Sequence, residues 1–414
     1  MSELNYLEKL LDGTEVEWKA LGDVTSVLRG KRLTKNLLSA EEKFPVFHGG
    51  LEPLGYYNKS NRPANTVMII NVGASAGTVG YSTVDFWSSD GCFCLEHNEL
   101  LNNRFLYFAL IGYQSLLKSK VRVAGIPTLD AIVVNKLLIP IPCPSNPEKS
   151  LAIQSEIVRI LDKFTALTAE LTAELNMRKK QYNYYRDQLL SFDDEQEKPI
   201  YLAKLLDGVE VEWRTLGEIA VIYDGTHKTP KYTASGVPFV SVQNIKNLYG
   251  TNKYISPEDF KTYKNKPRKH DLFMTRIGDV GTCAIVEDDR PLAYYVTLAL
   301  IRINQQIAVP GFIRYLIESR FGKAELYKRT LIHAVPMKIN LGEIGKVAVP
   351  IPCPDNPEKS LAIQSEIVRI LDKFDTLTNS ITEGLPREIE LRQKQYEYYR
   401  DLLFSFPKPE TVSN

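Results

Sequence analysis

The residues of this sequence with the clearest chemistry of their own are cations, and many of them lie in two clusters. The first cluster is Arg29, Lys31, Arg32 and Lys35, in the segment SVLRGKRLTKNLL, which contains no acidic residue. Lysine and arginine bind phosphate oxygens, and arginine also pairs with the edges of bases. The cluster therefore predicts contact with DNA, and the plain alternative for any one residue is a solvated surface.

The second cluster is longer and includes aromatic and amide side chains. Between Gly225 and Arg276 there are ten lysines or arginines and three acidic residues. Gln243 and Asn244 lie among them, and amide side chains suit contacts with base edges. Since each cluster opens one half of the chain, we favour double-stranded DNA over a solvated face as the explanation of both.

Two glycine-containing segments occupy comparable places in the two halves. They read NVGASAG and TRIGDVG, and they contain the candidate contact residues Asn71, Ser75 and Arg276. Glycine lets a backbone turn tightly and come close to a phosphate. A hairpin turn without a ligand explains the same pattern, and neither segment is a nucleotide-binding G-x-G-x-x-G loop followed by a helix.

Several motifs of catalytic proteins are missing from the sequence. There is no Walker A segment, no N/D-P-P-Y/F motif, no glycine-rich S-adenosylmethionine loop and no metal-ligand spacing of histidines. We therefore predict no catalytic residue, no metal site and no cofactor in this chain. The net charge is +1, the five cysteines form no C-x-x-C pair, and no long apolar run exists. These features predict a cytoplasmic protein with reduced thiols and no membrane partner.

The elements that position these clusters are repeated within the chain. IPCPSNPEKSLAIQSEIVRILDKFTALT begins at Ile141 and returns at Ile351 with three changes. The leading block YLEKLLDGTEVEWKALGDV returns as YLAKLLDGVEVEWRTLGEI, and RKKQYNYYRDQLLSF returns as RQKQYEYYRDLLFSF. The segments between the blocks diverge. A repeated frame around two different bodies predicts a protein that meets one partner surface twice and reads two different targets.

The repeated tails predict long helices, and the bodies predict mixed α+β domains. Apolar residues recur at helical spacing from Ile157 to Leu189 and again from Ile367 to Leu403, with Ser150 as the expected N-cap of the first helix. A long amphipathic helix needs a partner, so we expect the two to pack as an antiparallel coiled coil. The second tail has four extra residues around EGLPRE, which predicts a break there. The bodies combine short strands and helical stretches.

The doubled blocks resemble the specificity subunit of type I restriction-modification systems, most closely its type IC group. The resemblance covers the whole chain through its repeats. It implies two target-recognition domains joined by two long antiparallel helices, with an internal pseudo-two-fold repeat. DGTHKTP is similar to the loop that opens many such domains, and VLRGKRLTK is a looser match. On this basis the expected DNA contacts in the second body are Thr226, His227, Lys228, Thr229 and Lys231.

The resemblance also implies the partners and the boundaries. Two methyltransferase subunits would dock on the helices and use S-adenosylmethionine, and restriction subunits would use ATP and Mg²⁺. The expected segments are a first block and domain at 1–147, a helix at 148–192, a second block and domain at 193–357, a helix at 358–406 with a break near 384–386, and a tail at 407–414. A methyltransferase-only complex and a coiled-coil scaffold for proteins are the alternatives.

Overall fold

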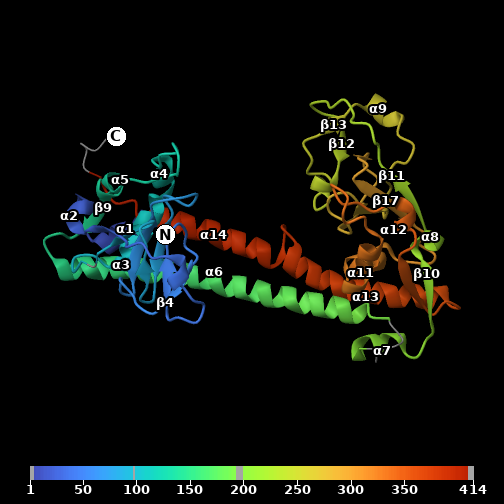
Figure 1. Cartoon of the computed structure of the whole chain (residues 1–414), viewed down its shortest axis with the longest axis horizontal. Helices are drawn as coiled ribbons and strands as arrows, with labels where there is room; N and C mark the ends of the chain where they lie inside the picture. The colour runs from blue at the N-terminus through green and yellow to red at the C-terminus, as the bar shows by residue number, and fades with distance from the viewer. Residues whose placement is uncertain (1–3, 97, 193–198, 409–414) are drawn as a thin grey trace. The chain divides into compact units, whose positions relative to one another are not determined.

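The computed structural model describes residues 4–96, 98–192 and 199–408, which form two compact units (Figure 1). The first unit comprises Met1–Leu171 and Glu388–Asn414, and the second comprises Thr172–Arg387. Each unit therefore contains one body, the beginning of one long helix and the end of the other. The α+β class and the two-domain organisation expected from the sequence are confirmed.

The two bodies have the same strand topology although their sequences diverge. The strands of the first unit are β1 (Val16–Ala20), β2 (Val27–Arg29), β3 (Phe44–Phe47), β4 (Gly55–Tyr57), β5 (Thr66–Ile70), β6 (Val79–Ser82), β7 (Trp87–Ser88), β8 (Cys92–Leu95) and β9 (Leu138–Pro142). They form sheets of order β2-β8-β5-β6, β4-β3-β7 and β1-β9. The four-stranded sheet is antiparallel throughout.

The second unit repeats this arrangement strand for strand. Its strands are β10 (Val211–Thr215), β11 (Ala220–Asp224), β12 (Val237–Val240), β13 (Tyr254–Ile255), β14 (Leu272–Thr275), β15 (Cys283–Ile285), β16 (Ala293–Tyr294), β17 (Leu298–Ile303) and β18 (Ala348–Pro352). Their sheets have the orders β11-β17-β14-β15, β13-β12-β16 and β10-β18. Each strand of one body thus has a counterpart in the other. The fold of the bodies is therefore repeated, although their sequences show no clear repeat.

Short helices complete each body. In the first unit they are α1 (Leu4–Leu11), α2 (Leu21–Val24), the 3-10 turn η1 (Lys35–Leu37), α3 (Asn103–Gly112), α4 (Gln114–Ser119) and α5 (Ala131–Asn135). In the second unit they are α7 (Ile200–Leu206), α8 (Leu216–Ile219), η2 (Val242–Asn244), α9 (Pro257–Lys261), α10 (Pro310–Glu318), α11 (Arg320–Arg329) and α12 (Leu341–Ile344). The one helical stretch expected in each body is present as two consecutive helices, α3 and α4 in the first unit and α10 and α11 in the second.

The long helices are α6 (Pro147–Leu189), α13 (Pro357–Asn379) and α14 (Gly384–Leu403). Both repeated tails begin with an asparagine cap followed by proline. The Oδ1 atom of Asn146 accepts a hydrogen bond from the backbone N–H of Lys149 at 3.0 Å, and Asn356 does the same for Lys359 at 3.0 Å. The N-cap predicted at Ser150 is wrong, because this serine lies inside α6, where its hydroxyl accepts a hydrogen bond from Gln154.

Aromatic contacts in the two units give the register of the long helices. In the first unit Phe164 of α6 stacks on Tyr399 of α14, with ring centroids 5.2 Å apart. In the second unit Tyr185 of α6 stacks on Phe374 of α13 at 5.4 Å. In each unit a segment of α6 therefore packs against a segment of the second repeated tail. The two pairs use the same two positions of the repeat, since Phe164 is equivalent to Phe374 and Tyr185 to Tyr399.

The four extra residues of the second tail form an interruption between α13 and α14. The break expected near residues 384–386 lies at 380–383 in the structure, directly after Asn379. Gly384 begins α14 with φ of +78°, and a Cβ there would overlap the carbonyl oxygens of Thr376 and Leu377. The turn therefore requires glycine at this position. Ile381, expected in the apolar stripe, is instead 70% exposed because it belongs to this interruption.

A buried glutamine joins each body to its long helix. In the first unit the side chain of Gln154 accepts a hydrogen bond from the N–H of Asn102 at 2.8 Å and donates to the carbonyl of Leu100 at 3.1 Å. Gln364 makes the same two contacts in the second unit, with Val309 and Ile307. These bonds join a glutamine of the repeated block to backbone atoms of the divergent body. The repeated block can therefore hold two bodies of different sequence with the same geometry.

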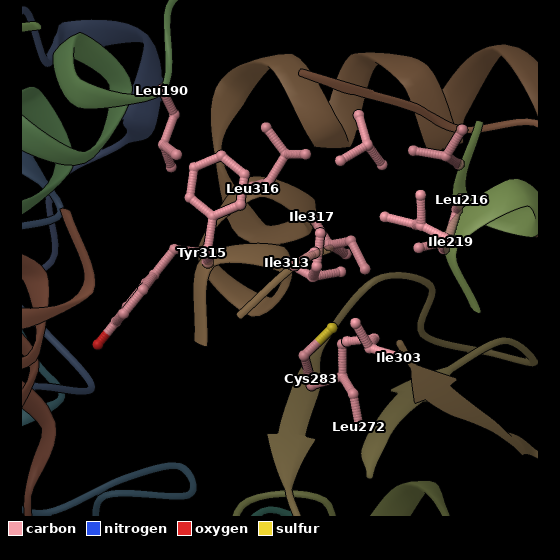
Figure 2. Close-up of a cluster of buried hydrophobic side chains, with 14 of the residues drawn as sticks. Leu190, Leu216, Ile219, Leu272, Cys283, Ile303, Ile313, Tyr315, Leu316 and Ile317 are labelled. Carbon is pink, nitrogen blue, oxygen red and sulfur yellow. The ribbon is translucent and has the colours of Figure 1, made fainter. Parts of the chain in front are cut away.

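Apolar side chains also join each body to its long helices. The core of the second unit combines strand, helix and long-helix residues, and Figure 2 shows Cys283 and Ile303 of the sheet against Ile313 and Ile317 of α10. Leu190, directly after α6, belongs to the same core. All five cysteines are free thiols, and Cys353 is the one of them that is not fully buried.

Candidate nucleic-acid interface

Four loops of each body meet at one end of its four-stranded sheet. We call this region the loop edge: residues 30–38, 71–77, 88–91 and 121–129 in the first unit, and 225–232, 276–281, 295–297 and 331–339 in the second. The sheet order explains the meeting. In an antiparallel sheet the carboxyl end of one strand lies beside the amino end of its neighbour. The first three loops follow β2, link β5 to β6 and precede β8, or their counterparts, so they leave the sheet together.

Backbone hydrogen bonds tie the loop edge of the first unit into one structure. The N–H of Lys31 donates to the carbonyl of Ser88 at 2.9 Å, and the N–H of Asn71 donates to Gly91 at 3.1 Å. The N–H of Leu129 then donates to the carbonyl of Asn71 at 2.9 Å. The basic loop, the turn before β8, the glycine turn and the loop after α4 are therefore linked in series.

The second unit repeats these links with different residues. Thr226 of the basic loop bonds to the segment around Tyr295: its N–H donates to the carbonyl of Tyr294 at 3.2 Å, and its carbonyl accepts from the N–H of Val296 at 3.0 Å. The N–H of Arg276 donates to the carbonyl of Thr297 at 3.0 Å, and Ile339 donates to Arg276 at 3.0 Å. The same four loops are thus held in the same order in both bodies.

One glycine in each unit lets the basic loop come close to the segment that precedes β8 or β17. A Cβ at Gly30 would overlap the carbonyl oxygens of Ser88 and Ser89, and a Cβ at Gly225 would overlap the backbone of Tyr295. In both cases the nearest atoms belong to the backbone, which cannot move aside as a flexible side chain can. A larger residue would have to push the loop away from the sheet. The two glycines, in RGKR and DGTH, therefore set the position of the cations that come after them.

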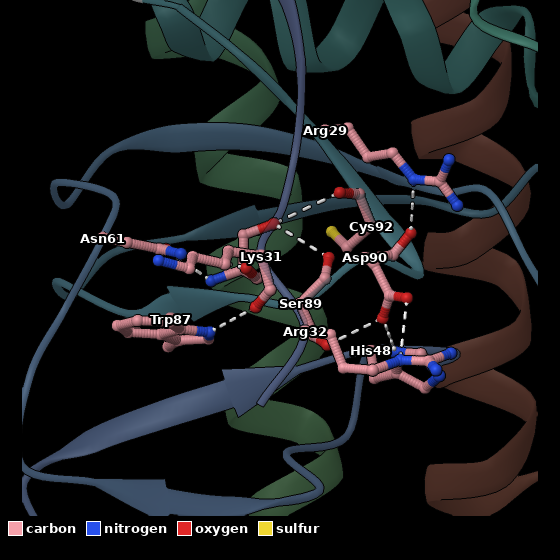
Figure 3. Close-up of polar contacts among 10 residues, drawn as sticks. Arg29, Lys31, Arg32, His48, Asn61, Trp87, Ser89, Asp90 and Cys92 are labelled. Atoms are coloured by element: carbon pink, nitrogen blue, oxygen red, sulfur yellow. Dashed lines mark hydrogen bonds and ion pairs between the residues drawn. The ribbon is translucent and has the colours of Figure 1, made fainter. Parts of the chain in front are cut away.

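Asp90 organises the polar side chains of the first loop edge (Figure 3). Its carboxylate lies 2.9 Å from Nε of Arg32 and 3.4 Å from Nδ1 of His48, and its carbonyl accepts a hydrogen bond from Nε of Arg29 at 3.1 Å. The indole N–H of Trp87 donates to the carbonyl of Lys31 at 2.7 Å. These contacts hold the loop backbone while the Arg32 side chain stays 75% exposed.

In the second unit Asp224, the last residue of β11, has a similar role from a different position in the fold. One of its carboxylate oxygens lies 2.7 Å from Nε2 of His227, and the other lies 3.5 Å from the Arg276 guanidinium. The hydroxyl of Tyr294 donates to the Asp224 carbonyl at 3.1 Å. Burial, followed by the nearby Asp224 carboxylate, raises the pKa of Tyr294, so this hydroxyl stays a neutral donor.

The structure leaves most of the predicted cations at the surface of the two loop edges. Lys31 and Lys35 are exposed in the first unit, and His227, Lys228 and Lys231 are exposed in the second. Within the described residues no carboxylate forms an ion pair with any of these four lysines. Thr226 is half-buried, and its hydroxyl exchanges hydrogen bonds with the backbone of Lys228, while Thr229 is exposed. These residues stay predicted DNA contacts.

Two of the candidate residues are buried and hold the loops together. Asn71 is 2% exposed and Arg276 is 8% exposed. The Arg276 guanidinium donates to the carbonyl of Val296 at 3.0 Å. A DNA contact needs an exposed side chain, which neither residue has here, so we assign both a positioning role. Ser75, in the first glycine turn, is half-buried.

The two amides predicted to read bases differ in the structure. Gln243 is exposed on η2, which is fixed to the loop edge by the N–H of Val242 donating to Oγ1 of Thr297 at 3.1 Å. Asn244 is half-buried, and its Oδ1 accepts from the N–H of Ser241 at 3.2 Å as part of a capping box. Gln243 is therefore the better candidate for a base contact, and Asn244 shapes the turn beneath it.

Several residues of the loop edge were missed from the sequence. Asp90 and Asp224 carry no motif, and Asn61, which accepts from the N–H of Ser88 at 2.7 Å, comes from a distant loop. The loops after α4 and α11 were missed because exposed apolar residues look like core residues in a sequence. Among residues 4–96, 98–192 and 199–408, no group of three or more metal-ligating side chains gathers, and no helix is long and apolar enough to cross a membrane.

Comparisons with known proteins agree with this organisation. The family model "Type I restriction modification DNA specificity domain" matches residues 14–178 and 208–391. The chain is 41% identical to the EcoR124I/EcoR124II specificity subunit of Escherichia coli, over all of both chains. It is 31% identical to a putative type I restriction enzyme specificity subunit of Haemophilus influenzae, over 97% of this chain and 98% of that one.

Solved structures show a similar fold. The S subunit of a type I restriction-modification system from M. genitalium matches with a TM-score of 0.60 at 18% identity, over 96% of this chain and 98% of that one. A chain from a structure describing complex assembly of a type I restriction-modification system matches with a TM-score of 0.53 at 16% identity, over 94% and 97%. At these identities the likeness concerns the fold alone.

Proposed function

The chain belongs to the family of type I restriction-modification DNA specificity subunits, and from this premise we propose that each loop edge reads one half of a bipartite DNA site. The observation that carries the proposal is the pair of loop edges with the same four loops and different exposed side chains. One scaffold that presents two different sets of exposed side chains suits two different half-sites. Those exposed side chains would determine which bases each half-site contains.

The charges of the loop edges support duplex DNA as the ligand. Lys31, Lys35, Lys228 and Lys231 lie on exposed loops, whereas the arginines Arg29 and Arg32 contact Asp90. Point charges on flexible stems suit phosphate contacts, and Gln243 suits a base edge. The net charge of +1 means that this attraction is local.

The repeated frame supports the docking of two methyltransferase subunits. On the long helices Met177 and Tyr184 are exposed seven residues apart, and Leu391 and Tyr398 are exposed at the equivalent positions of the other copy. Seven residues make about two helical turns, so each pair lies on one face of its helix. We expect Tyr184→Asp to reduce the complex from two methyltransferase subunits to one in native mass spectrometry. Two bound subunits would contradict this docking face.

The chemistry is expected to come from the partners. Methyltransferase subunits would supply S-adenosylmethionine and transfer the methyl group to adenine, and restriction subunits would supply ATP and Mg²⁺ chemistry. The chain alone should then give no methyl transfer to DNA with S-adenosylmethionine, and addition of methyltransferase subunits should restore it. Methyl transfer by the isolated chain would overturn this division of roles. Such a complex acts on genomic DNA in the cytoplasm.

DNA affinity separates this function from the scaffold alternative. If phosphates are bound, the affinity of the chain with its methyltransferase subunits for cognate duplex falls steeply with salt, by a log–log slope of about 0.9 for each neutralised phosphate. A complex with no salt-dependent affinity for duplex DNA would favour a protein scaffold. A methyltransferase-only complex is distinguished by purification from the host, where no ATP-dependent subunit would be found.

A further inference from the structure

Each loop edge carries an exposed apolar loop at one end. The first apolar loop is residues 122–128, closed by a β-bridge between Arg122 and Thr128, and the second is 331–338, closed by a β-bridge between Leu331 and Lys338. At their tips Val123 is 80% exposed, Ile126 is 70% exposed and Val335 is 101% exposed. Exposed aliphatic side chains gain nothing in water, so two such tips at equivalent places indicate a binding role.

The apolar loops are firmly joined to the rest of the loop edge. The N–H of Gly73 donates to the carbonyl of Pro127 at 2.9 Å, and the N–H of Gly278 donates to the carbonyl of Met337 at 2.8 Å. Both glycines have positive φ, of +87° and +85°, which turns each N–H toward the loop. The same backbone contact therefore presents an apolar tip beside the glycine turn in both bodies.

The charges around the apolar loops match a polyanion. From Lys118 to Leu129 and from Lys328 to Ile339 there is no acidic residue. The cations within these two stretches are Lys118, Lys120, Arg122, Lys328, Arg329 and Lys338. Some of this charge is used inside the protein, since Arg122 pairs with Asp130 at 3.1 Å, and Lys328 and Arg329 both pair with Glu325, at 2.9 Å and 2.8 Å. The cations of these stretches without an ion pair among the described residues are Lys118 and Lys120 beside the first loop and Lys338 in the second, and these positive charges suit DNA.

The sequences of the loops argue against a shared protein partner. The first loop with its flanks reads VRVAGIPTL and the second reads LIHAVPMKI, so the letters differ while the apolar, basic character stays. The long helices, which are expected to meet one partner surface twice, keep the repeated blocks nearly letter for letter. If one protein surface bound both apolar loops, we would expect the two loops to have similar sequences as well. Base pairs of two different half-sites require only an apolar wedge of suitable shape.

We propose that the two apolar loops are wedges that enter the DNA and open the base stack within each half-site. Val123 and Ile126 would do this in the first unit, and Ile332 and Val335 in the second. Apolar side chains inserted between base steps are a known way to unstack and bend DNA. A methyltransferase subunit can reach an adenine only after the base leaves the stack, so a wedge here would lower the cost of that step.

This proposal rests on DNA recognition by the loop edges and is tested in the complex with methyltransferase subunits. Once the half-sites are known, 2-aminopurine is placed next to the target adenine of one half-site at a time, and fluorescence reports unstacking. We expect fluorescence to rise at both half-sites with the wild-type complex. Val123→Ser with Ile126→Ser should abolish the rise at one half-site, and Ile332→Ser with Val335→Ser at the other. Ile381→Ser, at a residue 70% exposed outside the loop edges, is the matched control and should change neither signal.

The outcomes separate this inference from the proposed function. If the wild-type complex binds its site but no fluorescence rises, or if the loop variants keep the full rise, the wedge is wrong and recognition stands. If no salt-dependent binding to duplex occurs at all, the proposed function fails instead. If the loop variants lose methyltransferase subunits before DNA is added, as native mass spectrometry would show, the loops are a protein-docking surface and the wedge is overturned.

Discussion

At the scale of single residues, one carboxylate in each unit forms ion pairs with some cations of the loop edge and leaves the lysines unpaired in the described part of the chain. Asp90 holds Arg32 beside His48, and Asp224 holds His227 beside Arg276. These contacts fix the loops but neutralise part of their charge. The lysines of the same loops have no such partner among the described residues. Binding energy from phosphates is therefore expected to come mainly from lysines, and loop geometry from the two aspartates.

The first prediction concerns Lys228. If its ammonium group binds a phosphate, Lys228→Ala weakens binding of the complex to cognate and unrelated duplex alike and lowers the salt slope by about one. Gln243→Ala, if the amide reads a base, should cost about 1–3 kcal/mol on the cognate site only. Fluorescence anisotropy over a range of salt concentrations measures both effects.

The control for this pair is Lys204→Ala, an exposed lysine of α7 outside the loop edge. It should leave both affinity and salt slope unchanged. If Lys228→Ala and Gln243→Ala behave like the control, the DNA lies on another face of the body.

The second prediction uses two buried tyrosines at equivalent positions of the repeat. Burial is the main cause that raises the pKa of Tyr182 and of Tyr396 to about 12, against an ordinary value near 10. The folded protein therefore holds these protons more tightly than the unfolded chain. Each tyrosine contributes stability below pH 10 that is lost as pH rises from 10 to 12, about 2–3 kcal/mol at most.

Tyr182→Phe and Tyr396→Phe remove the ionising group and keep the ring. The double variant should lose less of its free energy of unfolding than the wild type between pH 10 and 12, measured by urea titration at each pH. Equal losses in the two proteins would show that these hydroxyls ionise as freely in the fold as in water.

At the scale of elements, the tandem TAELTAEL in α6 should act as a spacer. It occupies residues 168–175, and none of these side chains is fully buried. One more TAEL adds about 6 Å to a helix and rotates the part of the helix beyond the insertion by about 40°. B-DNA turns by about 34° per base pair, so rotation suggests one base pair while length alone suggests up to two. We predict a spacer longer by one base pair, because groove phase must match.

Methylome sequencing of a strain that carries the insertion measures this spacer directly. Both half-sites should stay the same, since neither loop edge changes. An unchanged spacer would mean that the tandem is only helix filler and that the distance between half-sites is set elsewhere.

The elements show where sequence reasoning succeeds. The long helices follow from local periodicity and from a four-residue insertion, so their existence and the break could be predicted, although the break lies at 380–383. The matching strand orders could not, because β2, β8 and β5 pair across distant segments that share no local signal. The basic loops could be found from charge. Asp90 and the apolar loops could not, since their roles depend on neighbours that only the fold supplies.

At the scale of the whole molecule, each unit combines a divergent body with repeated helix segments from both halves of the sequence. Gln154 and Gln364 join body and helix by the same hydrogen bonds in both units. The exposed side chains of a body can therefore change without any change in how the body attaches to its long helix. We infer from this that each body specifies one half of the recognised site independently of the other.

Methylome sequencing of a strain that expresses the chain with its methyltransferase subunits tests this independence, with and without replacement of the second body by that of a relative. For the unaltered chain we predict methylated adenines in one motif made of two specific halves and an unspecified spacer. After the replacement, one half should change and the other should remain. A continuous motif, or a replacement that alters both halves or neither, would contradict independent reading by the two bodies.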